Sequence, residues 1–171
     1  ATPQQGFELF TPDCSYTDDT ICTIAIADAV LNERDYQESL LDWCRRYPDP
    51  MGGYGKRFYQ WINSDNPQPT DSCGNGSAMR VSPIGWLFDE WEDVIEEAKK
   101  SAIISHNHPE GIKGAQCIAE AIYWLRLMRF SKSDLERKVK KFFGYKLPPM
   151  RDIKKIGSEG HFDGTCQETV P

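Results

Sequence analysis

The sequence predicts an all-α fold arranged as one domain, and three observations lead to this prediction. Apolar side chains recur at helical spacing in about five or six segments, and the alternating pattern of a β-strand is almost absent. Loops rich in Gly, Pro, Ser and Asn separate these segments. The chain has 171 residues and no internal repeat, so residues 1–171 are expected to form one domain around one core.

The first strong helix is expected over residues 18–31, where nearly every side chain is apolar. A helix that is apolar on almost all sides is typical of a buried central helix rather than a surface one. Residues 1–16 are expected to form an extended lead-in. A second helix, over residues 36–46, is amphipathic and directs Trp43 and its neighbouring leucines toward the core.

The middle of the chain combines a short helix with a long loop. The short helix contains Phe58, Trp61 and Ile62 and follows a stretch rich in Pro and Gly. Residues 63–76 form the longest irregular stretch and are rich in Ser, Asp, Asn and Pro. A loop of this length inside a compact domain is usually functional or disordered.

Three more helices are expected in the second half of the chain. The first covers about residues 86–101, where apolar residues follow i, i+3, i+4 spacing and acids occupy the opposite face. The second covers residues 112–128 and is mostly apolar. The third is basic and amphipathic; residues 131–134 cap its start and it ends at Phe143. The chain from Gly144 onward is expected to be loop-like.

The overall charge and the cysteine pattern narrow the class of protein. A net charge of −6 and a pI near 5.1 argue against a nucleic-acid surface or an anionic-membrane surface. No apolar run approaches the roughly 20 residues of a transmembrane helix, and no secretory signal opens the chain. The six cysteines form no CxxC pair, so they predict a reduced, cytoplasmic protein without a zinc site.

The start of the first helix carries one hydroxyl and two adjacent carboxylates, those of Thr17, Asp18 and Asp19. One interpretation is helix capping, in which Thr17 is the N-cap and both acids offset the positive end of the helix dipole. The other is that the three side chains are hard oxygen ligands for Mg²⁺, presented from a rigid helix start into a cleft. Helix capping explains these residues fully, so the three residues alone do not decide whether a metal binds here.

Two later loops offer further polar groups, each shortly before an apolar helix. Residues 74–77 combine two glycines, an amide and a hydroxyl, which suits close backbone approach to a diphosphate; the alternative is a turn with an N-cap. Residues 105–108 hold two imidazoles, those of His106 and His108, but HxH spacing without a third ligand is weak support for a transition metal. Helix N-termini gathered around one cleft would suit phosphate groups.

Taken together, the three loops resemble those of the ADP-ribosylglycohydrolases, relatives of the dinitrogenase reductase-activating glycohydrolase. The matching segments occur in the order of the family, with similar spacing, and they cover nearly the whole chain. They are residues 16–20, residues 74–83, residues 105–111 and, as the next segment along, residues 166–171.

The resemblance implies a compact orthogonal multi-helix domain with two Mg²⁺ ions in a cleft. There the N- or O-glycosidic bond between ADP-ribose and a modified protein side chain or small conjugate would be hydrolysed. Thr17, Asp18 and Asp19 would be metal ligands, and Asp19, or else Asp18, would accept a proton from the attacking water. His106, with His108 as the less certain alternative, would contact the ligand. The loop around the phosphates and the distal ribose would consist of Gly74, Asn75, Gly76, Ser77, Ala78 and Met79.

Two features of the family are absent from this sequence. One is an N-terminal helix with a Gly-Asp segment, and the other is a second Asp-x-Asp-Thr cluster that completes the dinuclear site. The fold and the ligand set are therefore expected to be incomplete, with an exposed apolar patch on the first helix, an oligomer or a complementary segment. Two alternatives to hydrolysis stay open: a catalytically deficient module that binds ADP-ribose, and a truncated helical interaction protein.

Overall fold

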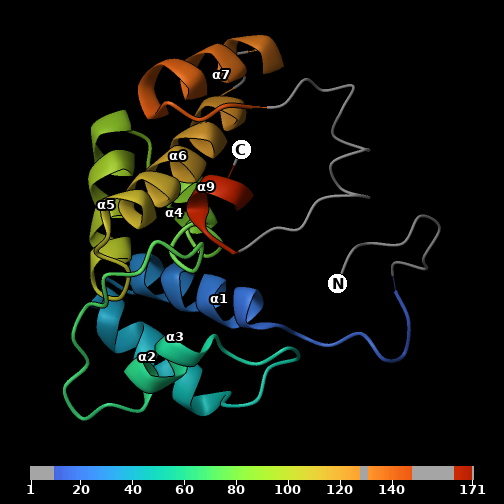
Figure 1. The fold of residues 1–171 in the computed structure, drawn as a ribbon, viewed down its shortest axis with the longest axis vertical. Helices are drawn as coiled ribbons and strands as arrows, with labels where there is room; N and C mark the ends of the chain where they lie inside the picture. Colours follow the sequence, from blue (N-terminus) through green and yellow to red (C-terminus); the bar gives the residue numbers. More distant parts are fainter. Residues whose placement is uncertain (1–9, 128–130, 148–163, 171) are drawn as a thin grey trace.

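The computed structural model describes residues 10–127, 131–147 and 164–170, and it confirms the all-α prediction. Within these ranges all regular secondary structure is helical, and β-pairing is limited to three isolated bridges between loops. A central helix, α1 (Asp18–Leu31), lies between two groups of helices (Figure 1). On one side are α2 (Tyr36–Arg46) and α3 (Lys56–Ile62), and on the other are α4 (Ser82–Leu87), α5 (Trp91–Ile103) and α6 (Pro109–Arg126).

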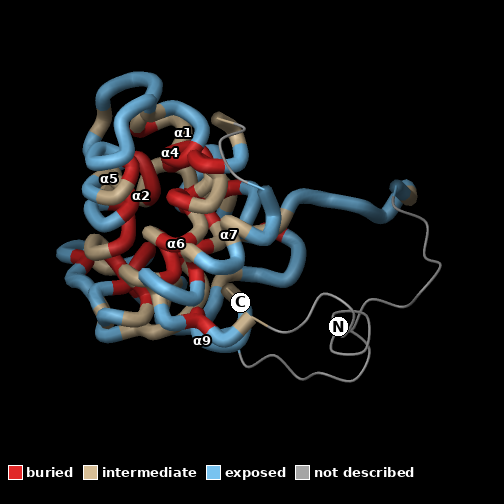
Figure 2. The backbone as a smooth tube through the Cα atoms, turned by 90° about the horizontal axis from the view of Figure 1, so that it is seen from above, coloured by how far each residue is buried: buried red, intermediate tan, exposed pale blue. Residues whose placement is uncertain are grey.

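The helix α1 forms at the predicted residues and supplies much of the core. Figure 2 shows that buried residues gather in the centre of the helical body. Those of α1 are Ile21, Cys22, Ala25, Ile26 and Ala29. Ile24 and Leu31 lie seven residues apart on one face of the helix, and they are 39% and 66% exposed. The prediction that α1 is buried on almost all sides is therefore wrong for this face, whereas the expectation of exposed apolar side chains on the first helix agrees with it.

Asp28 of α1 links α1 to α2 through several hydrogen bonds. Trp43 Nε1 and Ser39 Oγ donate to its Oδ2 at 2.9 and 3.2 Å. Asn32 Nδ2 donates to its Oδ1 at 2.6 Å, and Arg34 forms an ion pair with it. The hydrogen bonds from Trp43, and then from Asn32 and Arg34, lower the pKa of Asp28 to about 2.

The helices α2 and α3 form where the sequence predicts them. The Asp35 carboxylate caps α2 and accepts the backbone N–H groups of its first turn. Cys44 of α2 is buried, and its Sγ lies 3.9 Å from Sγ of Cys22 in α1. All six cysteines are free thiols. In α3, Phe58 and Trp61 stack with ring centroids 5.4 Å apart.

The single helix predicted over residues 86–101 is wrong, because two helices, α4 and α5, occupy this region. Phe88 and Glu90 between them have extended backbones. The carbonyl groups freed by this break are bonded by α6: Arg126 Nη2 donates to Phe88 O at 2.6 Å, and the Tyr123 hydroxyl donates to Asp89 O at 3.1 Å. Tertiary hydrogen bonds therefore replace the helical ones that a continuous helix would have made.

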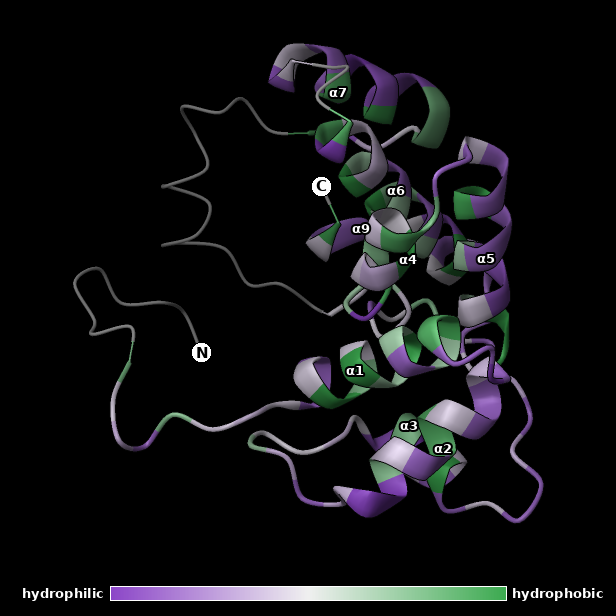
Figure 3. Ribbon diagram, turned by 180° about the vertical axis from the view of Figure 1, so that it is seen from behind, coloured by the Kyte–Doolittle hydropathy of each residue, from purple (hydrophilic) through white to green (hydrophobic). Residues whose placement is uncertain are grey.

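The helix α6 begins three residues earlier than predicted, with His108 as its N-cap and Pro109 in its first turn. The predicted end at Met128 lies outside the described residues. The backbones of α4 and α6 approach closely, because a Cβ added to Gly85 would lie only 2.6 Å from Ala119 O. The outward face of α5 is hydrophilic, whereas α1 is largely hydrophobic (Figure 3).

The end of the described chain adds three short elements. The capping box between Ser131 and Asp134 starts α7 (Lys132–Lys138), and the π-helix η1 (Val139–Phe143) continues it to the predicted end. The short helix α9 (Cys166–Thr169) occupies a segment predicted to be loop-like, and it packs against α6. Among the described helices, none has the length and apolar character needed to cross a bilayer.

Candidate active site

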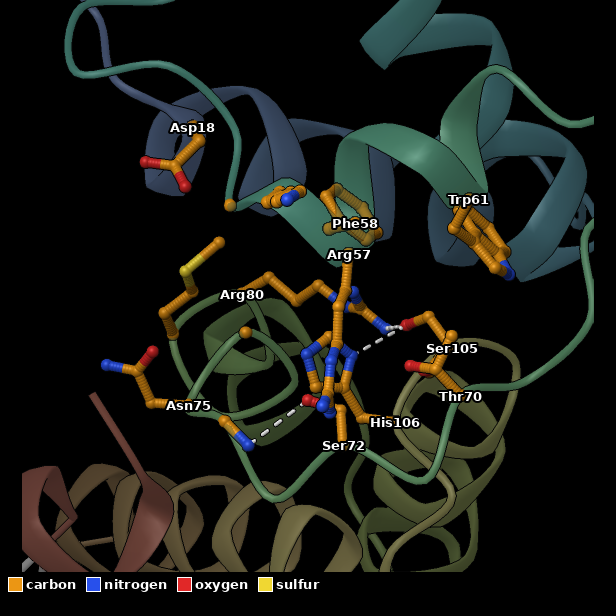
Figure 4. A pocket seen from close by; sticks show the side chains of 15 residues that line it. Asp18, Arg57, Phe58, Trp61, Thr70, Ser72, Asn75, Arg80, Ser105 and His106 are labelled. Carbon is orange, nitrogen blue, oxygen red and sulfur yellow. Dashed lines mark hydrogen bonds between the residues drawn. The ribbon is translucent and has the colours of Figure 1, made fainter. Parts of the chain in front are cut away.

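A cavity of about 330 Å³ lies between the start of α1, the α3 segment and the loops before α4 and α6 (Figure 4). It brings together side chains that are far apart in the sequence. The predicted site residues that line it are Asp18, Gly74, Asn75, Gly76, Met79 and His106. The sequence-predicted loops therefore meet at one place.

The three oxygen-bearing residues at the start of α1 do not all reach this cavity. Asp18 lines it, whereas Thr17 and Asp19 are not among its lining residues. Thr17 is the N-cap; its backbone N–H donates to Thr20 Oγ1 at 3.3 Å, and its hydroxyl donates to Asp19 Oδ2 at 3.4 Å. Burial, and secondarily the charge of Asp19, raise the pKa of Asp18. One helix start therefore combines capping with a carboxylate that faces the cavity.

The glycine loop, residues 74–79, contributes both the surface of the cavity and the layer beneath it. Ser77 and Ala78 are buried, and the Ser77 hydroxyl donates to Gly111 O at 2.8 Å. A Cβ added to Gly76 would lie 2.7 Å from His106 Nε2, which is closer than side chains tolerate. Close approach to the imidazole, rather than an unusual backbone angle, therefore requires glycine at this position.

Residues from the end of the chain hold the glycine loop in place. The Asn75 N–H donates to Gly164 O at 2.9 Å, and the Cys166 N–H donates to Cys73 O at 2.9 Å. The Cys166 thiol also donates to Gly74 O at 3.4 Å. Cys166 in turn packs on Gly114 of α6, where an added Cβ would lie 2.5 Å from its Sγ. The shape of the loop thus depends on α9 and α6.

The two histidines of the loop before α6 have different positions. His106 is 7% exposed, lines the cavity and pairs its Nδ1 with Ser105 Oγ at 2.9 Å. Burial, and secondarily the positive charge of Arg80, lower the pKa of His106 to about 3. His108 is outside the cavity lining, and its Nδ1 accepts the Glu110 N–H at 3.1 Å as the cap of α6.

Arg80 is a cavity residue to which the sequence analysis gave no role. Its side chain is buried, with 1% exposure, and its guanidinium lies 5.8 Å from the Phe58 ring. Nη2 donates to Ser101 O at 2.7 Å and to Ser105 Oγ at 2.8 Å, whereas Nε has no hydrogen-bond partner among the described residues. Arginine is normally exposed, so the sequence carried no signal for this burial beyond its place beside the glycine loop.

The segment around α3 supplies the other lining groups that the sequence analysis missed. Lys56 and Arg57 bring two further cations to the cavity, and Phe58 and Trp61 bring aromatic rings. The aromatic spacing indicated only a core-facing helix, because apolar periodicity does not distinguish a core from a ligand cavity. Together with Arg80, the cavity has three cationic side chains against the single carboxylate of Asp18.

The oxygen atoms at the start of α1 are of the type that binds magnesium, but they are too few to complete its coordination shell. Thr17 Oγ1 and Asp19 Oδ2 lie 3.4 Å apart, and hydroxyl and carboxylate oxygens are the hard ligands that Mg²⁺ prefers. In the part of the chain that the structure describes, however, no group of three or more His, Cys, Asp or Glu side chains is placed to hold a metal. The donor set at this helix start is therefore partial.

Comparison with known proteins decides the family. The family model described as ADP-ribosylglycohydrolase matches residues 3–156, which is most of the chain. The chain belongs to the ADP-ribosylglycohydrolase family. The match spans the start of α1, the glycine loop and the His106 loop, so the segments that line the cavity all fall within the family domain.

Similar curated proteins include ADP-ribosylhydrolase ARH3 from several vertebrates. The Gallus gallus protein is 31% identical over 128 residues, covering 64% of this chain and 34% of the relative. The Homo sapiens protein is 29% identical over 149 residues, covering 76% and 40%. The Escherichia coli protein YegU is 29% identical over 123 residues, covering 63% and 36%. The matched part of the chain thus spans between 34% and 40% of the length of these relatives.

A solved structure supports the fold assignment. The structure titled "ADP-ribosylglycohydrolase-related protein complex" aligns with a TM-score of 0.61 and covers 90% of this chain and 56% of that chain. The sequence identity is 19%, so this likeness shows the ADP-ribosylglycohydrolase fold and nothing about the ligand.

Proposed function

We propose that this chain forms the ADP-ribose site of a glycohydrolase. The reaction is hydrolysis of the N- or O-glycosidic bond between ADP-ribose and a modified protein side chain or small conjugate. The observation that carries this proposal is the single cavity that contains Asp18, the glycine loop and His106, in a chain of the ADP-ribosylglycohydrolase family.

The charge of the cavity favours a diphosphate ligand. Lys56, Arg57 and Arg80 line it, so the cavity carries an excess of positive side chains although the net charge of the protein is −6. Guanidinium and ammonium groups form strong charge-assisted hydrogen bonds with phosphate oxygens. The glycine loop lets a diphosphate approach the backbone, and the rings of Phe58 and Trp61 offer apolar surface to the remainder of the ligand.

Asp18 is the carboxylate positioned to take part in the chemistry. We assign it the role of general base in preference to Asp19, because Asp18 lines the cavity and Asp19 does not. In this reaction the oxygen of water attacks the anomeric carbon of the distal ribose, and the bond to the leaving nitrogen or oxygen breaks. Asp18 accepts the proton of the attacking water, and the leaving group acquires a proton from solvent.

Thr17, Asp18 and Asp19 are the residues that would hold magnesium, with water and substrate oxygens completing the shell. Bound Mg²⁺ supplies orientation of ribose hydroxyls and a lower pKa for water. Mg²⁺ binding is testable without turnover by magnesium titration calorimetry, in which the triple variant T17A/D18N/D19N should lose the heat of binding. An unchanged isotherm would exclude this helix start as the metal site.

A second candidate function is binding of ADP-ribose without cleavage. The observation that favours it is the partial metal-ligand set among the described residues, because weak Mg²⁺ binding would lower turnover and leave the cavity intact. In this case the chain would recognise ADP-ribosylated proteins or conjugates as a module.

Calorimetry and a hydrolysis assay distinguish the two candidates. ADP-ribose should bind the wild-type chain, and AMP, which lacks the diphosphate and the distal ribose, should bind more weakly. Release of ADP-ribose from ADP-ribosyl-serine or ADP-ribosyl-arginine proteins would support the hydrolase, with loss of release in Asp18→Asn and in EDTA. Binding without release supports the module, and absence of ADP-ribose binding would contradict both.

A further inference from the structure

Three buried side chains form a chain of hydrogen bonds that ends at the cavity (Figure 4). Arg80 Nη2 lies 2.8 Å from Ser105 Oγ, and Ser105 Oγ lies 2.9 Å from His106 Nδ1. Arg80 and Ser105 are each 1% exposed, and His106 is 7% exposed. Water therefore has little access to these groups, so their hydrogen-bond partners are mainly neighbouring protein groups.

The direction of each hydrogen bond follows from the chemistry of the groups. A guanidinium group has only donors, so Arg80 donates and Ser105 Oγ accepts. The hydroxyl of Ser105 retains its own single hydrogen. Among the described residues, His106 Nδ1 is the only acceptor within reach of that hydrogen. The hydroxyl therefore donates to Nδ1, which must be the unprotonated nitrogen of the ring.

The opposite arrangement leaves a buried donor without a partner. If Nδ1 carried the proton, it would donate to an oxygen that already accepts from Arg80, and the Ser105 hydrogen would have no acceptor. A buried unpaired donor is costly, so this arrangement is disfavoured. A doubly protonated ring is disfavoured as well, because burial and the charge of Arg80 keep His106 neutral above about pH 3.

The remaining nitrogen, Nε2, faces the glycine loop and the cavity. It lies 2.7 Å from the position that a Cβ on Gly76 would take, and 4.0 Å from the equivalent position on Gly74. With Nδ1 unprotonated in a neutral ring, Nε2 carries the proton. The imidazole therefore presents an N–H group to the part of the cavity assigned above to the ADP-ribose phosphates and distal ribose.

We propose that Arg80 and Ser105 are positioning residues that fix His106 as the neutral Nε2–H tautomer. In this form His106 donates a hydrogen bond to an oxygen of the bound ligand and does not accept a proton at Nε2. The claim that His106 donates to a bound ligand rests on the proposed function. The claim about the His106 tautomer concerns the protein alone. The site thus selects a hydrogen-bond acceptor at this position, such as a phosphate or ribose oxygen.

The tautomer can be measured directly on the ligand-free wild-type chain. Two-bond ¹H–¹⁵N correlation spectra at neutral pH distinguish a protonated from an unprotonated ring nitrogen, and the spectrum of His106→Gln assigns the His106 signals. We expect the Nε2 shift of a protonated nitrogen and the Nδ1 shift of an unprotonated one. The reverse pattern in the wild type would overturn the proposal; the shifts themselves are measured on the wild-type chain, and His106→Gln serves only to assign them.

A matched pair of serine variants tests the role of the Ser105 hydroxyl. Ser105→Ala removes the donor to Nδ1. The chemical shifts of both ring nitrogens should then move toward the values of a mixture of the two neutral tautomers of His106. Ser101→Ala is the control, because Ser101 is equally buried but its hydroxyl donates to Ala98 O and only its backbone carbonyl contacts Arg80. Unchanged shifts in Ser105→Ala, or equal changes in both variants, would overturn the proposal.

Calorimetry then connects the tautomer with the ligand. Ser105→Ala should bind ADP-ribose roughly twofold more weakly than the wild type, because in a mixed population about half of the rings no longer donate from Nε2. Ser101→Ala should bind as the wild type does. If the wild type shows the Nε2–H tautomer and does not bind ADP-ribose, the proposed function fails and the positioning by Arg80 and Ser105 stands. If the wild type binds ADP-ribose and its Nδ1 is protonated, the proposed function stands and the positioning by Arg80 and Ser105 fails.

Discussion

Gly76 and His106 are in direct contact, with no room between them for a side chain at position 76. A Cβ on Gly76 would lie 2.7 Å from His106 Nε2 and 2.8 Å from Cε1. Because the ring is also hydrogen-bonded at Nδ1 by Ser105, moving it away from Gly76 would strain or break that hydrogen bond. The position of the glycine loop and the position of the imidazole ring therefore constrain each other.

Gly76→Ala should disrupt this arrangement. The added methyl group must displace either the loop or the ring, and overpacking of this kind costs about 1–3 kcal/mol of stability. We expect a lower melting temperature and a loss of ADP-ribose affinity, both measured on the purified variant. Gly74→Ala is the graded comparison, because its Cβ would first meet the flexible Ser72 hydroxyl at 3.3 Å. Equal effects of the two substitutions would contradict the assigned contact.

Removing the partly buried charge of Asp28 should weaken the packing of α1 against α2. Trp43, Ser39 and Arg34 would then donate to a neutral amide oxygen, and we expect Asp28→Asn to lose about 1–3 kcal/mol of unfolding free energy at pH 7. Urea unfolding at neutral pH measures this loss. Asp89→Asn is the control, since the Asp89 side chain is 85% exposed and its ion pair contributes little.

The Asp28 contribution should also depend on pH in a defined direction. The pKa of Asp28 is lowered from 3.8 to about 2 in the folded protein, so the unfolded chain binds the proton first on acidification. The stabilisation is present above about pH 4 and is lost as the pH falls through 2. The difference in unfolding free energy between the wild type and Asp28→Asn should therefore shrink between pH 5 and pH 2.5. A difference independent of pH would contradict the assignment.

Gly114→Ala should act on the glycine loop from a distance. The new Cβ would lie 2.5 Å from Cys166 Sγ, which forces α9 away from α6 and strains the hydrogen bonds between Cys166 and the glycine loop. We expect weaker ADP-ribose binding together with a lower melting temperature. The double variant G114A/C166A should recover part of both losses, because it removes the sulfur. Strictly additive effects in the double-mutant cycle would show that the two positions are not coupled.

The cations near α3 should contribute to ADP-ribose affinity through the diphosphate. Arg57→Gln and Lys56→Gln should each weaken binding about three- to tenfold at low salt, with a smaller effect at high salt because these exposed charges are screened. Titration calorimetry at two ionic strengths measures both. Lys99→Gln removes an exposed lysine of α5 that is not among the residues lining the cavity, and it should leave the affinity unchanged. Affinities of the cavity variants that match that of Lys99→Gln would contradict a diphosphate at this position.

The sequence was most informative where local patterns determine structure. The bounds of α2 follow from its apolar periodicity and the Asp35 cap, and the start of α7 follows from the Ser131–Asp134 capping box. The division between α4 and α5 could not be predicted, because the groups that satisfy the freed carbonyls come from Tyr123 and Arg126. These partners are more than 30 positions away and carry no local signal.

The sequence predicted which loops meet at the cavity, but it predicted less well which side chains line it. Three loops that share polar residues before apolar helices do meet, as their pattern indicates. Spacing alone did not separate His106, which faces the cavity, from His108, which caps α6. It also did not reveal Arg80, because only the folded core shows that a guanidinium is enclosed there. The roles of all these residues in binding and catalysis stay predictions.

The attachment of the glycine loop to Gly164 and Cys166 has a consequence for protein synthesis. Cys166 follows Gly74 by 92 positions, and ribosomes add roughly 5–20 residues per second. The segment that bonds to the loop therefore emerges several seconds after the loop itself, when the helices from α1 to α6 have already been made. A nascent chain therefore contains all of the helices from α1 to α6 before Gly164 and Cys166, the hydrogen-bond partners of the glycine loop, have been made.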